Sequence, residues 1–418
     1  METLYINGGR RLDGSLEVVT AKNALLPILA GSIICGKEVV IRKVAKFSDV
    51  KMMTQILDSL GCATEFEDDT LIINSSLADK FTLKDEFTKK VRSSIFMLGP
   101  LLSRFRKARV AYPGGCNIGN RPIDLHIKGL KCLNVKIEEK HGYIFCDGKD
   151  MHAGEVHLDF PSVGATENII MASVTLKGVT TIYNAAKEPE IEDLQDFLNS
   201  MGCKVRGAGG STITIEGVES FHDCDYTPIK DRIVAGTYLI ACAMCGGNVR
   251  LEGARKEHNH ALINKITQSG VKIRCEKDAI EILSSGKLRS IPTIETQPYP
   301  GFPTDLQNQI LAMQTISKGT SVVIENLYES RLKICNELSR MGANITIKDR
   351  MAIINGVDKL YGASVVATDL RGGAGLVLAG LTAEGYTTIE DIYHIDRGYL
   401  SIEEDLCKLN AEIKRCEK

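Results

Sequence analysis

The sequence predicts an α/β protein of two similar domains, each containing three repeated helix–helix–sheet units. The chain has 418 residues, more than one ordinary core holds, and one pattern recurs six times along it. In each copy a helical stretch ends in Gly or Asn, and short strands with alternating polar and apolar residues follow. Gly and Asn tolerate the left-handed conformation that ends many helices. These residues, 68 to 73 positions apart, are Gly61, Asn134, Gly202, Gly270, Gly342 and Asn410.

A second recurring piece lies between these copies and consists of an apolar helix, a glycine and a strand. The copies read GSIICGKEVVIRKV, VTLKGVTTIYNA, ACAMCGGNVRLEGA, TISKGTSVVIENL and LTAEGYTTIEDI. The copy near residues 101–110 is degenerate and lacks the glycine. Each unit is therefore expected to hold two helices and three or four strands.

The repeats also predict how the chain is divided. The sixth copy stops after its first strand, and the N-terminal TLYINGGRRLDG resembles the strand that is missing, so residues 1–20 are expected to complete the last repeat. The first domain would then comprise residues 21–230, and the second would comprise residues 1–20 together with 231–418. The chain would cross between the domains near Thr20 and near Lys230. Two crossings form a hinge, and a cleft between domains is a common place for ligands.

Each unit contains a nearly all-apolar helix, which belongs inside a domain, and each of these helices begins with polar residues. The starts are Lys22-Asn23, Arg92 to Ser94, Ser162 to Thr166, Asp231-Arg232, Thr304-Asp305 and Asp369 to Arg371. Helix N-termini attract phosphates and carboxylates, so these starts are candidates for an anion-binding cleft. The alternative is simple capping, which suits Ser162 and Thr304. Capping suits lysine and arginine poorly, because a cation at an N-terminus is unfavourable unless an anion joins it.

Composition excludes several classes of protein. Lys and Arg total 51 against 53 Asp and Glu, a balance that argues against a general nucleic-acid binder. The first residues lack the apolar stretch of a signal peptide, and apolar runs such as 24–35 are too short to span a membrane. A cytoplasmic protein with reduced cysteines is expected. Cys242 and Cys245 form a Cys-x-x-Cys, but they lie in an apolar helix without a second pair, which favours a structural role over metal binding.

Longer motifs carry a resemblance to a known family. They are GGRRLDGSLEVVTAKNALLPILA, VRSSIFMLGPLL, PGGCNIGNRPIDLH, PSVGATENI, AAKEPEI, FPTDLQNQ, ELSRMGA, ATDLRGGAGLVLAG and IYHIDRGY. From Gly8 to Tyr399 the chain resembles the UDP-N-acetylglucosamine 1-carboxyvinyltransferases, which are enolpyruvyl transferases. The resemblance implies the family's inside-out α/β barrel, built twice from three repeated units. It also implies the first committed step of peptidoglycan precursor synthesis, and hence a part in cell shape and division, with phosphoenolpyruvate and UDP-N-acetylglucosamine as substrates and no cofactor or metal.

The resemblance assigns substrate-binding roles to residues of this chain. Those implied for phosphoenolpyruvate are Lys22, Asn23, Arg121, Arg371 and Arg397. Those implied for the UDP-sugar are Asn23, Arg92, Arg121, Pro122, Ile123, Asp124, Leu125, Ser162, Val163, Gly164, Asp305 and Leu327. Arginine gives bidentate contacts to carboxylate and phosphate, and a helix start such as 162–164 suits a diphosphate. Other members of the family have lysine where this chain has Phe160-Pro161, so part of the diphosphate charge must be met elsewhere.

Four residues are implied to be catalytic: Cys116, Asp305, Lys22 and Arg397. Cys116 lies in a glycine-rich loop and matches the family's general acid, which protonates phosphoenolpyruvate at carbon and reacts with epoxide inhibitors such as fosfomycin. The alternative is one more free thiol among 13 cysteines. Asp305 matches the residue that contacts the sugar 3-hydroxyl and accepts its proton, and its alternative role is a helix cap beside Thr304. Among the histidines, His394 is the strongest functional candidate because it lies three residues before Arg397.

Three other functions compete with this one. The sister enzyme of the family transfers the same group to shikimate phosphate, but it lacks the cysteine loop seen here as PGGCNIGNRP. A silent paralogue would bind UDP-sugar without turnover, although the four catalytic residues are present. An RNA-terminus-processing enzyme shares a related repeat, but no matching catalytic histidine is evident and the acidic composition offers no footprint for RNA.

Overall fold

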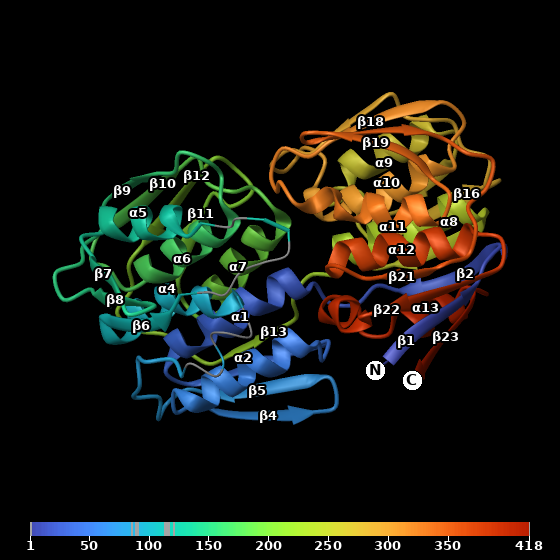
Figure 1. The fold of residues 1–418 in the computed structure, drawn as a ribbon. Coiled ribbons are helices and arrows are strands. Elements are labelled where there is room, and N and C mark those ends of the chain that lie inside the picture. Colours follow the sequence, from blue (N-terminus) through green and yellow to red (C-terminus); the bar gives the residue numbers. More distant parts are fainter. Residues whose placement is uncertain (1, 85–86, 88–91, 113–117, 120–121, 418) are drawn as a thin grey trace. The chain divides into compact units, whose positions relative to one another are not determined.

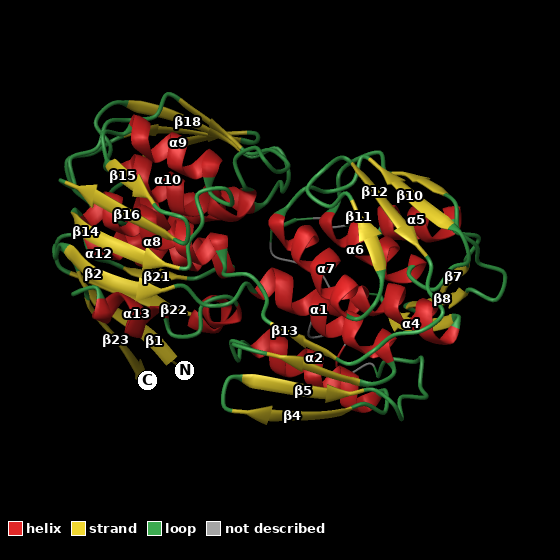
Figure 2. Cartoon of the chain, turned by 180° about the vertical axis from the view of Figure 1, so that it is seen from behind, coloured by secondary structure: helices red, strands yellow, loops and turns green. Residues whose placement is uncertain are grey.

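The computed structural model describes residues 2–417 except 85–86, 88–91, 113–117 and 120–121. The described residues form two compact units. Unit I contains residues 20–112 and 122–229, and unit II contains residues 2–19, 118–119 and 230–417. In each unit the helices lie inside and the strands lie on the outer faces (Figure 2). None of the described helices is long and apolar enough to cross a membrane.

Unit I holds three sheets around buried helices (Figure 1). The strand orders are β13(Cys224–Tyr226)-β3(Glu38–Ile41)-β5(Thr70–Asn74)-β4(Ala63–Glu67), β6(Lys107–Ala111)-β8(Tyr143–Asp147)-β7(Lys136–Lys140) and β9(Glu155–His157)-β10(Val179–Tyr183)-β12(Thr212–Glu216)-β11(Lys204–Arg206). The helices, with 3-10 helices marked η, are α1(Lys22–Cys35), α2(Ser48–Ser59), η1(Arg92–Met97), α4(Leu98–Phe105), α5(Asp124–Cys132), α6(Val163–Ser173) and α7(Pro189–Ser200).

Unit II repeats the plan with three four-stranded sheets. The strand orders are β2(Leu12–Glu17)-β14(Gly247–Glu252)-β16(Ala279–Ser284)-β15(Lys272–Cys275), β17(Thr293–Glu295)-β18(Thr320–Ile324)-β20(Met351–Asn355)-β19(Asn344–Lys348) and β21(Ser364–Val366)-β22(Tyr386–Glu390)-β1(Glu2–Asn7)-β23(Glu412–Glu417). The helices are α8(Arg232–Cys245), α9(His260–Gln268), η2(Thr304–Leu306), α10(Gln307–Thr315), η3(Arg331–Lys333), α11(Ile334–Arg340), α12(Leu370–Thr382), η4(Ile392–Arg397) and α13(Ile402–Lys408).

Each described sheet has three or four strands, as predicted, and the six share one pattern of strand directions. The first strand of each sheet runs parallel to the second, and the remaining strands are antiparallel. In the degenerate repeat the first strand is reduced to a single parallel bridge between Thr82 and Arg109. The six punctuating residues all take positive φ, from 62° at Asn134 to 100° at Gly202. The left-handed ends that the Gly and Asn spacing predicted are therefore confirmed.

The apolar helices end as the second recurring piece predicted. In unit II this turn places Gly246, Gly319 and Gly385 at positive φ. In the degenerate repeat of unit I, Arg106 takes the same left-handed conformation at φ 56°. Arg106 offsets the strain by donating a hydrogen bond to the backbone oxygen of Thr175, at 3.0 Å. The degenerate repeat therefore keeps the left-handed turn, although arginine stands where the other repeats have glycine.

The N-terminus closes the last repeat, but only in part as expected. Strand β1 lies between β22 and β23, so the missing strand is supplied from the start of the chain (Figure 1). Strand β2 instead pairs in parallel with β14 and completes the fourth repeat, which corrects the assignment of residues 1–20 to the last repeat. Each sheet needs a parallel first strand. The strand that precedes the fourth repeat in sequence, β13, pairs with β3 of unit I, and β2 takes its place in unit II.

Candidate active site

The three buried helices of unit II each begin at an aspartate. Asp231 accepts hydrogen bonds from the backbone nitrogens of Ile233 and Val234, at 2.8 and 3.0 Å. Asp369 accepts from the nitrogens of the second and third residues after it, both at 3.0 Å. Both are ordinary caps: they accept hydrogen bonds from free N–H groups, and their negative charge offsets the positive end of the helix dipole. Thr304, which the sequence suggested as a cap, is not one: its hydroxyl donates to Glu325 at 2.9 Å.

Asp305, the third aspartate, is held by two buried arginines. Its carboxylate lies 2.7 Å from Nη2 of Arg331 and 3.5 Å from Nη2 of Arg371. Those arginines are only 3% and 5% exposed. Burial alone would raise the pKa of Asp305, but the charges of Arg371 and Arg331 and the hydrogen bond from Arg331 hold it well below its usual range. The carboxylate is therefore ionised, and it is a weaker base than an ordinary aspartate.

Both arginines keep donors that the protein does not use. Nε and Nη1 of Arg331 and of Arg371 are buried and have no partner within hydrogen-bond distance, although the hydroxyl of Tyr399 lies close enough to Arg371 to raise its pKa. A buried unpaired donor costs roughly 1–3 kcal/mol, and more when it is charged, so such donors are rarely left in a native site without a reason. Planar guanidinium donors match the oxygens of carboxylate or phosphate. The arrangement therefore fits an anionic ligand beside Asp305.

Sequence reasoning missed Arg331. It lies in LYESRLK, where an arginine among polar residues has the pattern of a surface cation. Its burial follows from the loop after β18, which turns the 3-10 helix η3 toward η2. No local pattern in the sequence gives that turn. Only a pairing of Asp305 with a residue 26 positions later would have pointed to it.

The second part of the unit II site is η4, which carries His394 and Arg397. Burial lowers the pKa of His394, with Asp369 and Arg397 acting in opposite directions, so η4 lies against the start of α12. Asp396 is held by Arg415 of β23, whose Nη2 and Nη1 lie 2.6 and 3.0 Å from its carboxylate. Arg397 is thus the last residue of a short helix that is anchored to the last strand. Leu327 is half-buried on the loop after β18.

In unit I, Lys22 is the first residue of α1 and is 9% exposed. The helix has no side-chain cap and no acidic residue in its first turn. Nζ of Lys22 lies 3.3 Å from the buried carboxylate of Asp49, on α2. A cation at the start of a helix is unfavourable unless an anion joins it, and Asp49 is one such anion. Asn23 follows, half-buried, on the same turn.

The start of α6 is packed against the ring of His126. Ser162 caps the helix with a long contact of 3.4 Å to the nitrogen of Ala165. A side chain at Gly164 would come within 2.9 Å of Cε1 of His126, so glycine lets the ring approach this helix end. Val163 is the first helical residue between them.

The tautomer of His126 follows from Asn168. The oxygen of that amide accepts from the nitrogen of Gly99 at 2.7 Å, so its nitrogen must be the donor to the carbonyl of Ile95 and to Nδ1 of His126. Nδ1 is then an acceptor, and in the neutral ring the proton lies on Nε2, on the side of Gly164. One asparagine therefore joins three helices and orients this histidine.

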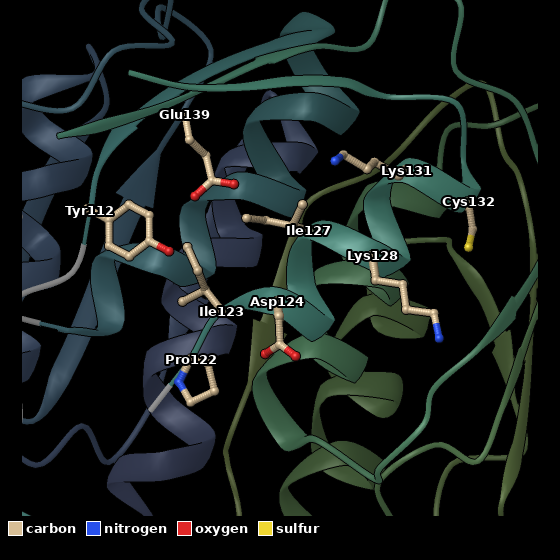
Figure 3. A pocket seen from close by; sticks show the side chains of 9 residues that line it. All are labelled: Tyr112, Pro122, Ile123, Asp124, Ile127, Lys128, Lys131, Cys132 and Glu139. Carbon is tan, nitrogen blue, oxygen red and sulfur yellow. The ribbon is translucent and has the colours of Figure 1, made fainter. Parts of the chain in front are cut away.

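A cavity of about 570 Å³ opens beside the start of α5 (Figure 3). Three residues predicted for the UDP-sugar line it: Pro122, Ile123 and Asp124. The other lining residues are Tyr112, Ile127, Lys128, Lys131, Cys132 and Glu139. Leu125, also predicted, is not among the lining residues.

Tyr112 connects this cavity with Arg92. Burial, the charge of Glu139 and a hydrogen bond to Glu139 raise the pKa of Tyr112, while Arg92 lowers it. Arg92 begins η1, so the start of that helix lies within electrostatic reach of the cavity. No pattern in the sequence pointed to Tyr112, which comes just before the glycine-rich loop.

Some predicted residues are not brought together. Cys116 and Arg121 lie outside the described residues. Cys242 and Cys245 are both in α8, where burial raises the pKa of Cys242 to about 12, so this pair is part of the core. Within the described ranges no cluster of three or more His, Cys, Asp or Glu is placed to hold a metal.

Comparisons with known proteins identify the class. Residues 6–406 match the family model described as EPSP synthase (3-phosphoshikimate 1-carboxyvinyltransferase). The enolpyruvyl transferase NikO from Streptomyces tendae superposes with a TM-score of 0.88 at 23% identity, covering 99% of this chain and 98% of that one. An EPSP synthase from Acinetobacter baumannii has a TM-score of 0.78 at 16% identity over both full chains. These structures show that the fold is that of the enolpyruvyl transferases.

Sequence relatives narrow the class. The UDP-N-acetylglucosamine 1-carboxyvinyltransferase 2 of Caldanaerobacter subterraneus is 50% identical over 415 residues, which cover 99% of this chain and all of that protein. The UDP-N-acetylglucosamine 1-carboxyvinyltransferase 1 of Clostridium acetobutylicum is 44% identical over the full length of both chains. The chain belongs to the EPSP synthase family, in its UDP-N-acetylglucosamine 1-carboxyvinyltransferase branch.

Proposed function

We propose that this chain transfers the enolpyruvyl group of phosphoenolpyruvate to the 3-hydroxyl of UDP-N-acetylglucosamine and releases phosphate. The observation that carries the proposal is the ionised Asp305 between two buried arginines with unused donors. That arrangement offers a proton acceptor and an anion site side by side. The motifs and the relatives at 42–50% identity supply the choice of substrates.

The two arginines have a second effect on the reaction. While they hold Asp305, its pKa stays too low for it to take a proton readily. An incoming carboxylate or phosphate that occupies the donors of Arg331 and Arg371 would reduce their pull on Asp305. Binding of phosphoenolpyruvate would thereby raise the pKa of the base at the moment when it is needed. Asp305 then accepts the proton of the sugar hydroxyl.

The chemistry is addition followed by elimination. Cys116, as general acid, protonates the methylene carbon of phosphoenolpyruvate, and the sugar oxygen attacks the carbon that bears the phosphate. The tetrahedral product then loses a proton from its methyl group, and the bond from carbon to the phosphate oxygen breaks. Arg121 and Arg397 with Lys22 would bind the anionic groups. Electrostatic stabilisation of this kind is usually the largest single contribution to rate.

The cavity beside α5 is a candidate binding site for the uridine, called here the uridine seat. Asp124 offers a carboxylate to the N–H of a pyrimidine base, and Tyr112 offers an aromatic ring. The start of α6 and the Nε2–H of His126 are candidates for the diphosphate, on the side where this chain has Phe160-Pro161 in place of lysine.

A phosphate-release assay tests the function. Purified protein is given phosphoenolpyruvate with UDP-N-acetylglucosamine, with shikimate 3-phosphate, or with no acceptor. Release with UDP-N-acetylglucosamine alone is the expected result. Release only with shikimate 3-phosphate would transfer the chain to the sister activity, and release with neither acceptor would overturn the proposal in favour of a silent paralogue.

The uridine seat has a test of its own. Cys132 is exposed and lines the cavity, whereas Cys407 is exposed in unit II and serves as an internal control. Alkylation followed by peptide mapping measures both thiols in one sample. UDP should slow the alkylation of Cys132 and leave that of Cys407 unchanged. Equal alkylation of Cys132 with and without saturating UDP would move the nucleotide elsewhere.

We further propose that the chain acts in the cytoplasm on small molecules, as a nearly neutral composition suggests. The double-crossing hinge near residues 20 and 230 is also a proposal. Small-angle scattering with and without UDP-N-acetylglucosamine measures it, because closure of a hinge reduces the radius of gyration.

A further inference from the structure

Glu325 is a buried carboxylate that the proposed chemistry does not use. It follows β18 directly and is 1% exposed. Its Oε1 accepts from the hydroxyl of Thr296 at 3.0 Å and from the backbone nitrogens of Leu327 and Tyr328 at 2.9 and 3.1 Å. Its Oε2 accepts from the hydroxyl of Thr304 at 2.9 Å. Four donors therefore converge on one side chain.

These donors belong to segments that carry site residues. Thr304 immediately precedes Asp305 in η2. Leu327 and Tyr328 begin the loop that leads to Arg331 in η3. Both members of the Asp305–Arg331 ion pair, 2.7 Å apart, are thus within three residues of a group bonded to Glu325.

A carboxylate suits this position better than other side chains. It offers only acceptors, and all four neighbours are donors. Among the described residues no lysine or arginine forms an ion pair with it, so its charge is met by hydrogen bonds alone. A buried charge of this kind is costly for stability, and such groups are best accounted for when they fix one arrangement of their surroundings.

We propose that Glu325 is a positioning residue for the transfer reaction, because its carboxylate sets the segment of Asp305 and the segment of Leu327 and Arg331 in one fixed geometry. This inference rests on the proposed function, since it takes Asp305 and Arg331 to act on the substrates. Displacing a reacting group by about 1 Å costs on the order of 100-fold in rate. A clamp shared by both segments prevents such a displacement.

The decisive variants change Thr304 and leave every site residue in place. Thr304→Val removes the hydroxyl that bonds to Oε2, and Thr304→Ser keeps it. Thr315→Val is the matched control, because Thr315 is also buried and its hydroxyl bonds only to the carbonyl of Ala312 at 2.7 Å, at the far end of α10. All three are compared with the wild type by steady-state kinetics well below their thermal midpoints.

Thr304→Val should lower kcat by about 10-fold with little change in KM for phosphoenolpyruvate, and Thr304→Ser should restore it. Thr315→Val should lower the thermal midpoint and leave kcat unchanged. If Thr304→Val lowers only the midpoint, as the control does, Glu325 is structural and the inference is wrong.

Glu325→Gln gives a second readout. An amide cannot accept from all four donors, so the hold of Arg331 on Asp305 should loosen and the pKa of Asp305 should rise toward its usual range. The acid limb of the kcat profile should then move to higher pH relative to the wild type. An unmoved limb contradicts the inference. A wild type without phosphate release would instead overturn the proposed function, so the two failures are distinct.

Discussion

Units I and II share one architecture, but aspartates lie at the starts of the buried helices of unit II and no acidic residue lies at those starts in unit I. In unit II the starts carry Asp231, Asp305 and Asp369. In unit I they carry Lys22, Arg92 and Ser162, and the first turns of α1, η1 and α6 contain no acidic residue. Aspartate caps offset the positive end of the helix dipole, so we propose that an anion in unit II would be bound by arginine side chains. In unit I the dipoles are unopposed by acid, which favours phosphate. The two units thus offer an anion two different kinds of surroundings.

Buried acids show a related contrast. Asp305 of unit II has two arginine partners, whereas Glu167 and Asp193 of unit I have no lysine or arginine partner among the described residues. Burial, with the charges of Glu190 and Glu188, raises the pKa of Glu167 well above its usual value. Burial also raises the pKa of Asp193 to about 7, despite hydrogen bonds from Tyr226 and from the backbone nitrogen of Ile229. The buried acids Glu167 and Asp193 of unit I therefore have raised pKa values, whereas Asp305 of unit II has a lowered one.

The largest expected effect tests the ionised acid. Asp305→Asn removes the proton acceptor and leaves two buried arginines without their anion, so phosphate release should fall by about 10³-fold. UDP-N-acetylglucosamine binding, measured by calorimetry, should change far less. The control is Asp278→Asn, which breaks an exposed pair with Arg255 in the same unit and should leave turnover unchanged. Turnover near wild type in Asp305→Asn would remove the distinction between the units.

The pH dependence of stability tests the protonated acid. Above about pH 4 the unfolded chain has released the proton of Asp193, while the folded protein keeps it until about pH 7. The contribution of Asp193 to the free energy of unfolding therefore falls between these pH values, by about 4 kcal/mol at most.

Asp193→Asn removes the titrating carboxyl group, so this decrease in the free energy of unfolding should disappear in the variant. Denaturant midpoints at pH 5 and pH 8 should differ less in the variant than in the wild type. A variant whose midpoints follow those of the wild type would show that Asp193 titrates normally.

Removal of a helix cap should cost more stability in unit II than in unit I, although the difference is smaller than the effects above. Asp369→Ala removes two hydrogen bonds of 3.0 Å and should cost about 1 kcal/mol, whereas Ser162→Ala removes one contact of 3.4 Å and should cost less than half of that. Asp369→Asn keeps a capping oxygen and separates charge from hydrogen bonding. Thermal midpoints of the three variants measure the difference. Equal losses would show that the charge at the helix start matters little.

The smallest effect concerns the degenerate repeat. Arg106→Gly relieves a left-handed conformation worth about 1 kcal/mol but loses the bond to Thr175 and adds freedom to the unfolded chain. The net change in unfolding free energy should stay within about 0.5 kcal/mol. Gly385→Arg, at the equivalent turn of unit II, has no such bond in place and should cost about 1 kcal/mol. A cost of about 1 kcal/mol for both would show that the hydrogen bond to Thr175 outweighs the left-handed strain at Arg106.

Much of the fold was predictable because its signals are local. A glycine or asparagine after each helix, and alternation in each strand, are enough to predict six units and the closure by β1. The pairing of β2 with β14 could not be predicted. The two strands are more than 200 residues apart, and no local pattern shows whether β2 joins the sheet of the fourth repeat or that of the sixth.

The site divides in the same way. Asp305 and Arg371 lie in motifs, so resemblance found them. Arg331 lies in none, and Thr304 was assigned as a cap because its best acceptor, Glu325, is 21 residues later in the chain. Which oxygen a hydroxyl bonds to is decided by tertiary packing, and the sequence around it carries little of that information.

The place of β1 in its sheet also has a consequence for biosynthesis. Every described strand of unit I lies within residues 38–226, so that unit can fold once its own segment has left the ribosome. Strand β1 precedes unit I in the chain but pairs with β22 and β23, which are synthesised more than 370 residues later. Until then its backbone groups have no partners, and an unpaired strand invites aggregation. Strand β1 is therefore expected to be open to pairing with other chains until the last strands of unit II have been synthesised.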